Sequence, residues 1–242
     1  MRQTLPFQEV ILVDDASTDD SLEVVQSFAG RLPSLRVLSL PERKGVSVAR
    51  DAGIRAASSM FISTLDSDDF FWSERKHEAE WRLVQSSRDP EMTAAFSDIR
   101  RVDRAGGDLG SVGAKKGIRE GRVFWSLLFL SGMIPRDFLF SREAYFKAGG
   151  YDKGFEIYED WDLKLRIAGF CRFLYSRETG VAYRDNPAGL SRAPLKNHYM
   201  TMSAILRKNT TALALHTKTF ARCYGTLRIL WFLRFKIAAL VE

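Results

Sequence analysis

The fold is decided by the stretch Met60-Phe61-Ile62-Ser63-Thr64-Leu65-Asp66-Ser67-Asp68-Asp69, an apolar run that ends abruptly in three carboxylates. Its β-branched and aromatic side chains predict a buried strand. The carboxylates then lie at the carboxyl end of that strand, which is the edge where open α/β sheets bind ligands. We therefore expect these acidic residues to line a binding crevice.

Three like charges so close in sequence repel one another unless a cation lies among them. Hard oxygen ligands in this number suit Mg²⁺ or Mn²⁺, with substrate phosphates completing the coordination shell. The alternative is a solvated acidic turn before a helix that Ser73 and Glu74 could open. An isolated D-x-D segment is more often such a turn, so the surrounding sequence has to decide.

Strands and helices alternate around this stretch. Strands are predicted at Val10–Val13 and Leu35–Leu40, and helices at Leu22–Ala29 and Val46–Ala57. This alternation is typical of an α/β fold with a mostly parallel central sheet, flanked by helices and joined by right-handed crossovers. Because acidic residues follow both the first and the third strand, both acidic clusters can line one crevice.

The second half of the chain shows a further strand at 94–99, a short helix that ends at Gly149-Gly150, and a helix that begins near Glu159. Acidic residues in a first helical turn also stabilise the helix dipole, which is a structural explanation for Glu159 and Asp160. The charged, glycine-containing segment 103–122 fits either a mobile loop near an active site or a plain surface insertion.

Composition narrows the classes of protein. The 242 residues carry a net charge of +6 and are 45% hydrophobic, which fits one α/β domain over 1–193 and a helical extension over 194–242. The charge favours an anionic partner, but the scattered basic residues lack the pattern of a nucleic-acid-binding protein. Cys171 and Cys223 suggest neither a disulfide framework nor a zinc site, so we expect a reducing, cytoplasmic location.

The segment 225–242 is apolar and aromatic but interrupted by Arg228, Arg234 and Lys236. These three charges make it a poor membrane span. Two interpretations remain open: peripheral contact with the inner face of a membrane, or packing as a helix on the domain.

Five segments follow one another in an order that is specific, although each is a weak signal alone. They are Val13-Asp14-Asp15-Ala16-Ser17-Thr18-Asp19, Lys44 to Ile54, Leu65-Asp66-Ser67-Asp68-Asp69, Phe140 to Asp152, and Glu159-Asp160-Trp161-Asp162-Leu163. Together they resemble glycosyltransferase family 2, the nucleotide-sugar-dependent enzymes with the GT-A fold. One departure is Asp51, which stands where the family usually has Asn.

The resemblance implies metal-dependent, inverting transfer of a sugar from a nucleoside-diphosphate sugar to a glycan, lipid-linked or other hydroxyl acceptor. It implies Mn²⁺ or Mg²⁺ as cofactor and no nucleic-acid partner. Arg50 could lie near the diphosphate, although a helix arginine packed on an acidic neighbour is the simpler explanation. The other implied roles are base and ribose contacts for Asp15 with Asp14, a ribose contact for Asp66, metal binding for Asp68, and catalytic base for Asp160 with Glu159 as its substrate-binding neighbour.

Members of this family normally have a strand and a helix before the V-D-D segment, whereas only Met1–Gln8 stand there. A strand–helix unit takes roughly 30 residues, so we expect a start upstream of Met1 or a degenerate copy of the enzyme. Without that unit, one edge of Val10–Val13 is predicted to be unpaired.

Three other classes are considered. A receiver-like domain could use Asp14, Asp15 and Asp66 as an acidic pocket, but that interpretation leaves the chain after about residue 125 unexplained. A haloacid-dehalogenase-type phosphatase would have its D-x-D segment early in the chain and Thr in place of Asp69. The third alternative is a non-catalytic protein that keeps the GT-A fold.

Overall fold

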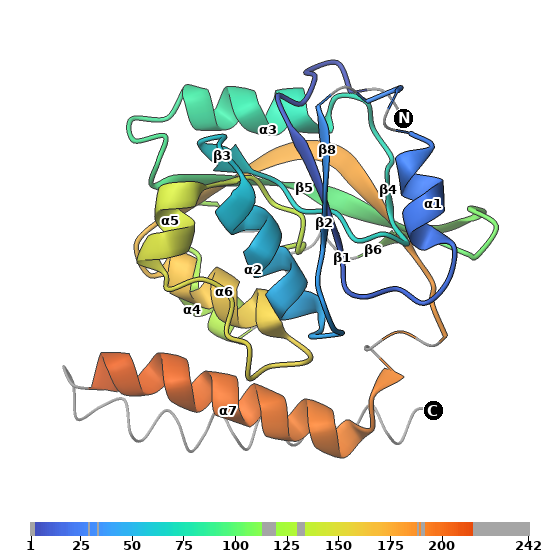
Figure 1. Cartoon of the computed structure of the whole chain (residues 1–242). Helices are drawn as coiled ribbons and strands as arrows, with labels where there is room; N and C mark the ends of the chain where they lie inside the picture. The colour runs from blue at the N-terminus through green and yellow to red at the C-terminus, as the bar shows by residue number, and fades with distance from the viewer. Residues whose placement is uncertain are drawn as a thin grey trace.

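The structure is a computed structural model that describes residues 3–28, 30–32, 34–112, 120–129, 134–187, 189 and 192–214. Figure 1 shows strands near the centre of the molecule, with helices around them and α7 at one end. In chain order the elements are β1 (Val10–Asp14), α1 (Ser21–Gln26), β2 (Leu35–Ser39), α2 (Val46–Ala56), β3 (Phe61–Ile62), β4 (Phe70–Phe71), α3 (Lys76–Gln85), β5 (Thr93–Val102), β6 (Asp108–Val112), α4 (Phe124–Phe129), β7 (Phe140–Ser141), α5 (Arg142–Lys147), α6 (Glu159–Ala168), β8 (Arg172–Arg184) and α7 (Leu195–Ala214).

The largest sheet has the strand order β4-β8-β5-β6. Its two long strands, β5 and β8, pair in parallel from Thr93 opposite Arg172 to Val102 opposite Arg184. The outer strands β4 and β6 pair antiparallel. The first six residues of β5 are buried, as expected for a strand covered on both faces. This sheet anchors the hydrophobic core.

The first two strands form a separate ladder. β1 and β2 are parallel, with Val10 opposite Leu35, so the sequence-based prediction of a parallel pair is confirmed. α2 packs closely on β1, because a Cβ on Gly53 would lie only 3.1 Å from Val13 Cγ2. A side chain at this glycine would push the helix away from the strand.

The third strand is shorter than the apolar run indicated and antiparallel where a parallel strand was expected. β3 covers only Phe61–Ile62 and pairs antiparallel with β7. Between β3 and the carboxylates the chain is held by side-chain hydrogen bonds. Thr64 Oγ1, for example, donates to Arg136 O at 3.2 Å. The acidic cluster therefore follows an extended segment held by side-chain hydrogen bonds, since no ladder partner reaches it among the described residues.

Two helices of the second half lie where the sequence indicated: α5 ends shortly before Gly149-Gly150, and α6 begins at Glu159. The hydroxyl oxygen of Ser141 accepts the N–H of Ala144 and caps α5, and α6 buries Trp161, Leu163, Leu165 and Ile167 in the main core. α7 packs against α6. Among the described residues, no helix combines the length and apolarity that crossing a membrane requires.

Some of the sequence-based predictions lie outside the described residues. These include the whole of 225–242 and the part of the 103–122 segment from 113 to 119. The described part of that segment contains β6, which forms a hairpin with β5. The boundary at 193/194 stays a prediction.

Candidate active site

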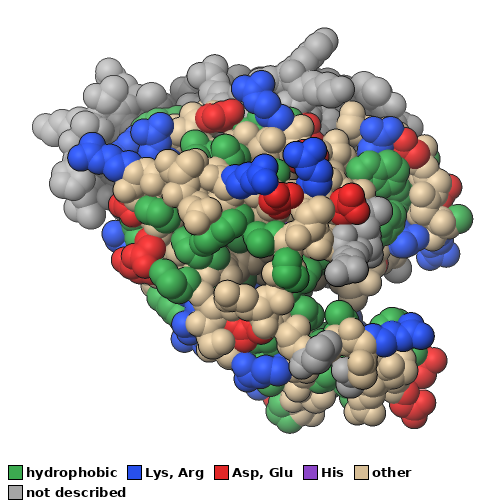
Figure 2. All heavy atoms as spheres, turned by 90° about the horizontal axis from the view of Figure 1, so that it is seen from above, with side chains coloured by type: hydrophobic (Ala, Val, Ile, Leu, Met, Phe, Trp, Pro, Cys, Tyr) green, Lys and Arg blue, Asp and Glu red, His purple; other side chains and the backbone are tan. Residues whose placement is uncertain are grey.

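A cavity of about 2260 Å³ opens between β1, β3, α2 and the start of α6. The face of the molecule seen in Figure 2 is deeply notched, with hydrophobic side chains at the notch. One wall of the cavity is apolar and consists of Val10–Val13, Ile54, Phe61 and Ile62. The opposite end is lined by carboxylates and arginines, so an apolar slot leads to a highly charged site.

Asp66, Asp68 and Asp69 form the acidic cluster of this site. One carboxylate oxygen from each lies within 4.8 Å of the others. Asp68 Oδ2 also accepts a hydrogen bond from Asn186 Nδ2 at 3.2 Å. Three carboxylates at this spacing are a donor set that fits a hard divalent cation. Burial raises the pKa of Asp69 to about 6, although Arg136 beside it acts in the opposite direction.

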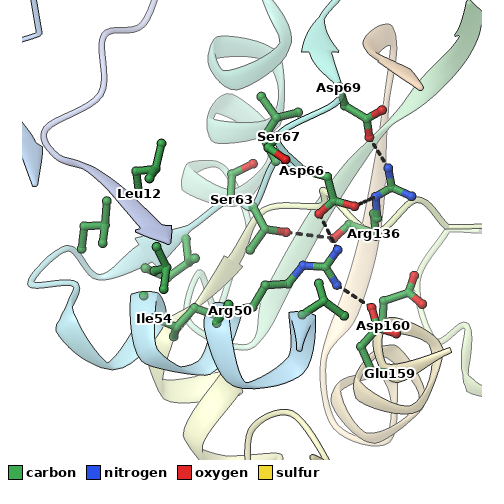
Figure 3. A pocket seen from close by; sticks show the side chains of 18 of the residues that line it. Leu12, Arg50, Ile54, Ser63, Asp66, Ser67, Asp69, Arg136, Glu159 and Asp160 are labelled. Atoms are coloured by element: carbon green, nitrogen blue, oxygen red, sulfur yellow. Dashed lines mark hydrogen bonds and ion pairs between the residues drawn. The ribbon is translucent and has the colours of Figure 1, made fainter. Parts of the chain in front are cut away.

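Arg50 links this cluster to the start of α6. Its guanidinium lies 2.5 Å from Asp66 Oδ1 and 2.6 Å from Glu159 Oε1, and Figure 3 shows it between the two acidic groups. Burial alone would lower its pKa, but Tyr151, Asp66 and Glu159 raise it well above the ordinary value. The structure thus shows the simpler of the two explanations for Arg50, in which it packs on acidic residues. Those acidic residues are themselves candidate site residues.

Arg136 is a second arginine of the site, and it was not predicted from the sequence. Its Nε lies 2.8 Å from Asp66 Oδ2, and its Nη2 is paired with Asp69. The guanidinium also covers the ring of Tyr183, 4.0 Å from the ring centroid. Arg136 lies in an extended stretch before β7, where neither periodicity nor motif marks it out.

The first turn of α6 brings Glu159 and Asp160 to the cavity. Tyr158 before them has a left-handed backbone with φ of 63°. Asp160 Oδ2 lies 2.7 Å from Lys164 Nζ, which also donates to Ile134 O at 2.6 Å. Burial alone would raise the pKa of Asp160, but Lys164 outweighs it and the pKa is lowered. Burial and Asp160 raise the pKa of Glu159. Asp160 is therefore the more acidic member of the pair.

Asp14 and Asp15 are held by backbone amides. Asp15 lines the cavity, and its two carboxylate oxygens accept the N–H groups of Lys44 and Gly45 at 2.7 and 2.8 Å. Asp14 is 6% exposed and accepts the N–H of Ser17 at 3.2 Å. Asp15 thus fixes the loop before α2, while Asp14 stabilises the turn from Asp14 to Ser17 that follows β1.

The amino-acid sequence of this chain is similar to those of known glycosyltransferases and polysaccharide synthases. Residues 1–106 match the family model described as glycosyl transferase family 2. The chain is 28% identical over 169 residues to chondroitin synthase of Escherichia coli, which covers 69% of this chain and 23% of that protein. It is 24% identical over 216 residues to hyaluronan synthase of Pasteurella multocida, covering 86% of this chain and 21% of that protein.

A shorter relative is succinoglycan biosynthesis protein ExoU of Rhizobium meliloti, with 27% identity over 196 residues, covering 72% of this chain and 53% of that protein. The chain thus spans about a fifth to a half of the length of these relatives. Among solved structures, Staphylococcus aureus TarS residues 1–349 with UDP has a TM-score of 0.62 at 16% identity, covering 86% of this chain and 58% of that chain. The same protein with UDP-GlcNAc also has a TM-score of 0.62, at 18% identity, covering 84% and 58%.

Proposed function

We propose that this chain, whose residues 1–106 match the glycosyl transferase family 2 model and whose fold is similar to that of TarS, transfers a sugar from a nucleoside-diphosphate sugar to an acceptor hydroxyl. The observation that carries the proposal is the placement of two acidic groups around Arg50. The acidic cluster with Asp66 lies on one side of the guanidinium, and the α6 acidic pair lies on the other (Figure 3). A donor site and an acceptor site can therefore face each other across one cavity.

On the donor side, Asp68 holds Mn²⁺ or Mg²⁺ together with the neighbouring carboxylates. When bound, the cation supplies Lewis-acid stabilisation of the negative charge that develops on the leaving diphosphate. Asp14 and Asp15 position the base and ribose of the donor, and Asp66 lies at the ribose. The TarS structures with UDP and UDP-GlcNAc support a nucleotide-sugar donor for this fold.

On the acceptor side, Asp160 acts as the base. The acceptor hydroxyl has a pKa far above neutral and has to lose its proton as it attacks the anomeric carbon. A carboxylate kept ionised by Lys164 is suited to accept that proton. Glu159 contributes to substrate binding and holds Arg50 in place. One displacement from the face opposite the diphosphate inverts the anomeric centre.

The relatives suggest the substrate class. Their names refer to chondroitin, hyaluronan and succinoglycan synthesis, so we propose a role in polysaccharide or glycan synthesis, with a glycan, lipid-linked or other hydroxyl acceptor. The protein would act in the cytoplasm, where the segment 225–242 could bring it to the inner face of the membrane.

A non-catalytic protein with the GT-A fold is the second candidate. It is favoured by one observation: Asp14 and Asp15 are already engaged with backbone amides. Turnover of a nucleotide sugar separates this candidate from the enzyme. The receiver-like alternative explains only the first half of the chain, whereas the structural likeness to TarS covers 86% of it.

The proposal is tested by calorimetry of UDP and GDP binding with and without Mn²⁺, followed by a hydrolysis screen of nucleotide sugars. We expect binding that requires the metal and is lost in Asp68→Ala. The matched control is Asp20→Ala, because Asp20 is exposed and its side chain caps no helix N–H. Metal-independent binding of equal strength in both variants would contradict the proposal.

A further inference from the structure

We propose that Arg136 is an exchangeable counter-ion: it neutralises Asp66 and Asp69 until the metal and the nucleotide arrive, and then turns to the diphosphate. This inference rests on the proposed function and assigns to it a residue that the sequence did not reveal. It starts from the fact that every oxygen of both carboxylates already has a partner in the structure.

The two oxygens of Asp66 are divided between two arginines, Arg50 on Oδ1 at 2.5 Å and Arg136 on Oδ2 at 2.8 Å. Asp69 is similarly occupied, because Oδ2 is paired with Arg136 and Oδ1 accepts the N–H of Arg184 at 2.9 Å. A cation that binds both carboxylates therefore competes with a guanidinium. Since like charges repel, a cation on those oxygen atoms weakens their pairing with the guanidinium.

Arg136 is the arginine that can leave. Arg50 is anchored by the second carboxylate, Glu159, at 2.6 Å, and its side chain is only 10% exposed. The side chain of Arg136 is 28% exposed and lines the cavity. It also rests on the Tyr183 ring, and such a stacking contact tolerates a change in the direction of the planar group.

The backbone of Arg136 is fixed, so that only its side chain has to turn. Its N–H donates to Tyr183 Oη at 3.1 Å, and its carbonyl accepts from Thr64 Oγ1 at 3.2 Å. Tyr183 Oη in turn donates to Asp137 Oδ1 at 2.6 Å. A guanidinium released at this point stays beside the acidic cluster. Its planar set of N–H donors matches the oxygen atoms of a phosphate group.

The experiment compares wild-type protein with Arg136→Gln in two calorimetric titrations, Mn²⁺ alone and UDP in saturating Mn²⁺. We expect opposite changes: Mn²⁺ alone binds about tenfold more tightly to the variant, and UDP binds about tenfold more weakly, as for one charge-assisted hydrogen bond. A purely structural residue would weaken both titrations together.

Two further variants make the result specific. Arg136→Lys keeps the positive charge but loses the planar pair of N–H donors. The affinity of this variant for Mn²⁺ alone should therefore stay near that of wild type, while UDP still binds more weakly. Arg100→Gln removes an arginine whose ion pair is with Asp108 on the outer hairpin and should change neither titration. Circular dichroism and the melting temperature confirm that each variant is folded.

The outcomes separate this inference from the function on which it rests. If wild-type protein binds Mn²⁺ and UDP but Arg136→Gln binds Mn²⁺ no more tightly, the exchange is wrong and the proposed function stands. If wild-type protein binds no UDP in Mn²⁺, the proposed function fails and the exchange fails with it.

Discussion

Lys76 Nζ lies 2.8 Å from Glu80 Oε2 within α3, and both side chains are completely shielded from solvent. Lys76 also donates to Asp137 O at 2.8 Å, and Glu80 Oε1 accepts the hydroxyl of Ser97 at 2.6 Å. The pair thus connects α3 to β5 and to the segment that carries Arg136. Burial raises the pKa of Glu80 to about 7, with Lys76 acting in the opposite direction.

Removing one member of this pair should be costly. We expect Glu80→Ala to lower the free energy of unfolding by about 3–5 kcal/mol, because it leaves a buried ammonium without its carboxylate. The control is Glu78→Ala, whose partner Arg82 is one turn further along α3 and largely exposed. That change should cost at most about 1 kcal/mol. Urea unfolding measures both, and equal losses would show that the buried pair has no special role.

His77 should make stability depend on pH. Burial, and then the charge of Lys76, lower its pKa to about 2. Nδ1 contacts Gln3 Oε1 at 2.9 Å, whereas the buried Nε2 has no hydrogen-bond partner among the residues that the structure describes. Between about pH 2 and about pH 6.5, His77 therefore binds a proton in the unfolded chain but not in the folded protein. The contribution of a neutral His77 is therefore complete above about pH 6.5 and decreases as the pH falls.

The measurement is urea unfolding at pH 8 and pH 5.5 for wild type and His77→Phe. Wild type should lose about 1 kcal/mol more than the variant between the two pH values. The difference between the proteins is the relevant quantity, because Glu80 titrates in the same range with the opposite sign. The same pH dependence in both proteins would mean that His77 is not the titrating group.

The edge of β1 that faces the cavity should exchange its amide hydrogens rapidly. The N–H of Val10 donates to Ser34 O at 3.0 Å on the β2 side. Since backbone groups alternate along a strand, the N–H groups of Ile11 and Val13 point to the other edge. No strand pairs with that edge in the part of the chain that the structure describes. We therefore expect fast hydrogen exchange at both positions.

Leu12 is the internal control for this prediction, because its N–H points towards β2 and should exchange slowly. Hydrogen exchange followed by NMR distinguishes these neighbouring residues. Strong protection at Ile11 and Val13 would contradict this prediction and would indicate that a further strand pairs with this edge.

Asp160 and Asp162 lie two residues apart on α6 and should respond differently to the same substitution. Asp160→Asn keeps the shape of the side chain and removes the proposed base, so transfer should fall by about 10²–10⁴-fold with donor binding nearly unchanged. Asp162 is fully buried and pairs with Arg166 and Lys208, so Asp162→Asn should lower the melting temperature and leave the folded fraction active.

Initial rates with a nucleotide sugar and melting curves of both variants test this contrast. If Asp160→Asn loses stability and activity in parallel, the first turn of α6 serves the helix dipole and not the reaction.

The sequence alone predicted the elements that depend on neighbouring residues. The parallel pair β1 and β2, the short helix α5 and the helix from Glu159 follow from local periodicity, and the structure confirms them. The acidic cluster was also apparent, because its residues are adjacent in the chain.

Tertiary structure decided what depends on residues far apart in the chain. β8 has a mixed polar sequence that predicts no buried strand, and it is central only because β5 pairs along it. Arg136 is one of 36 basic residues and enters the site through carboxylates about 70 positions away. The link from Arg50 to Glu159 spans 109 positions. Local patterns reflect backbone preferences, whereas such ion pairs exist only once folding has brought distant charges together and removed the water between them.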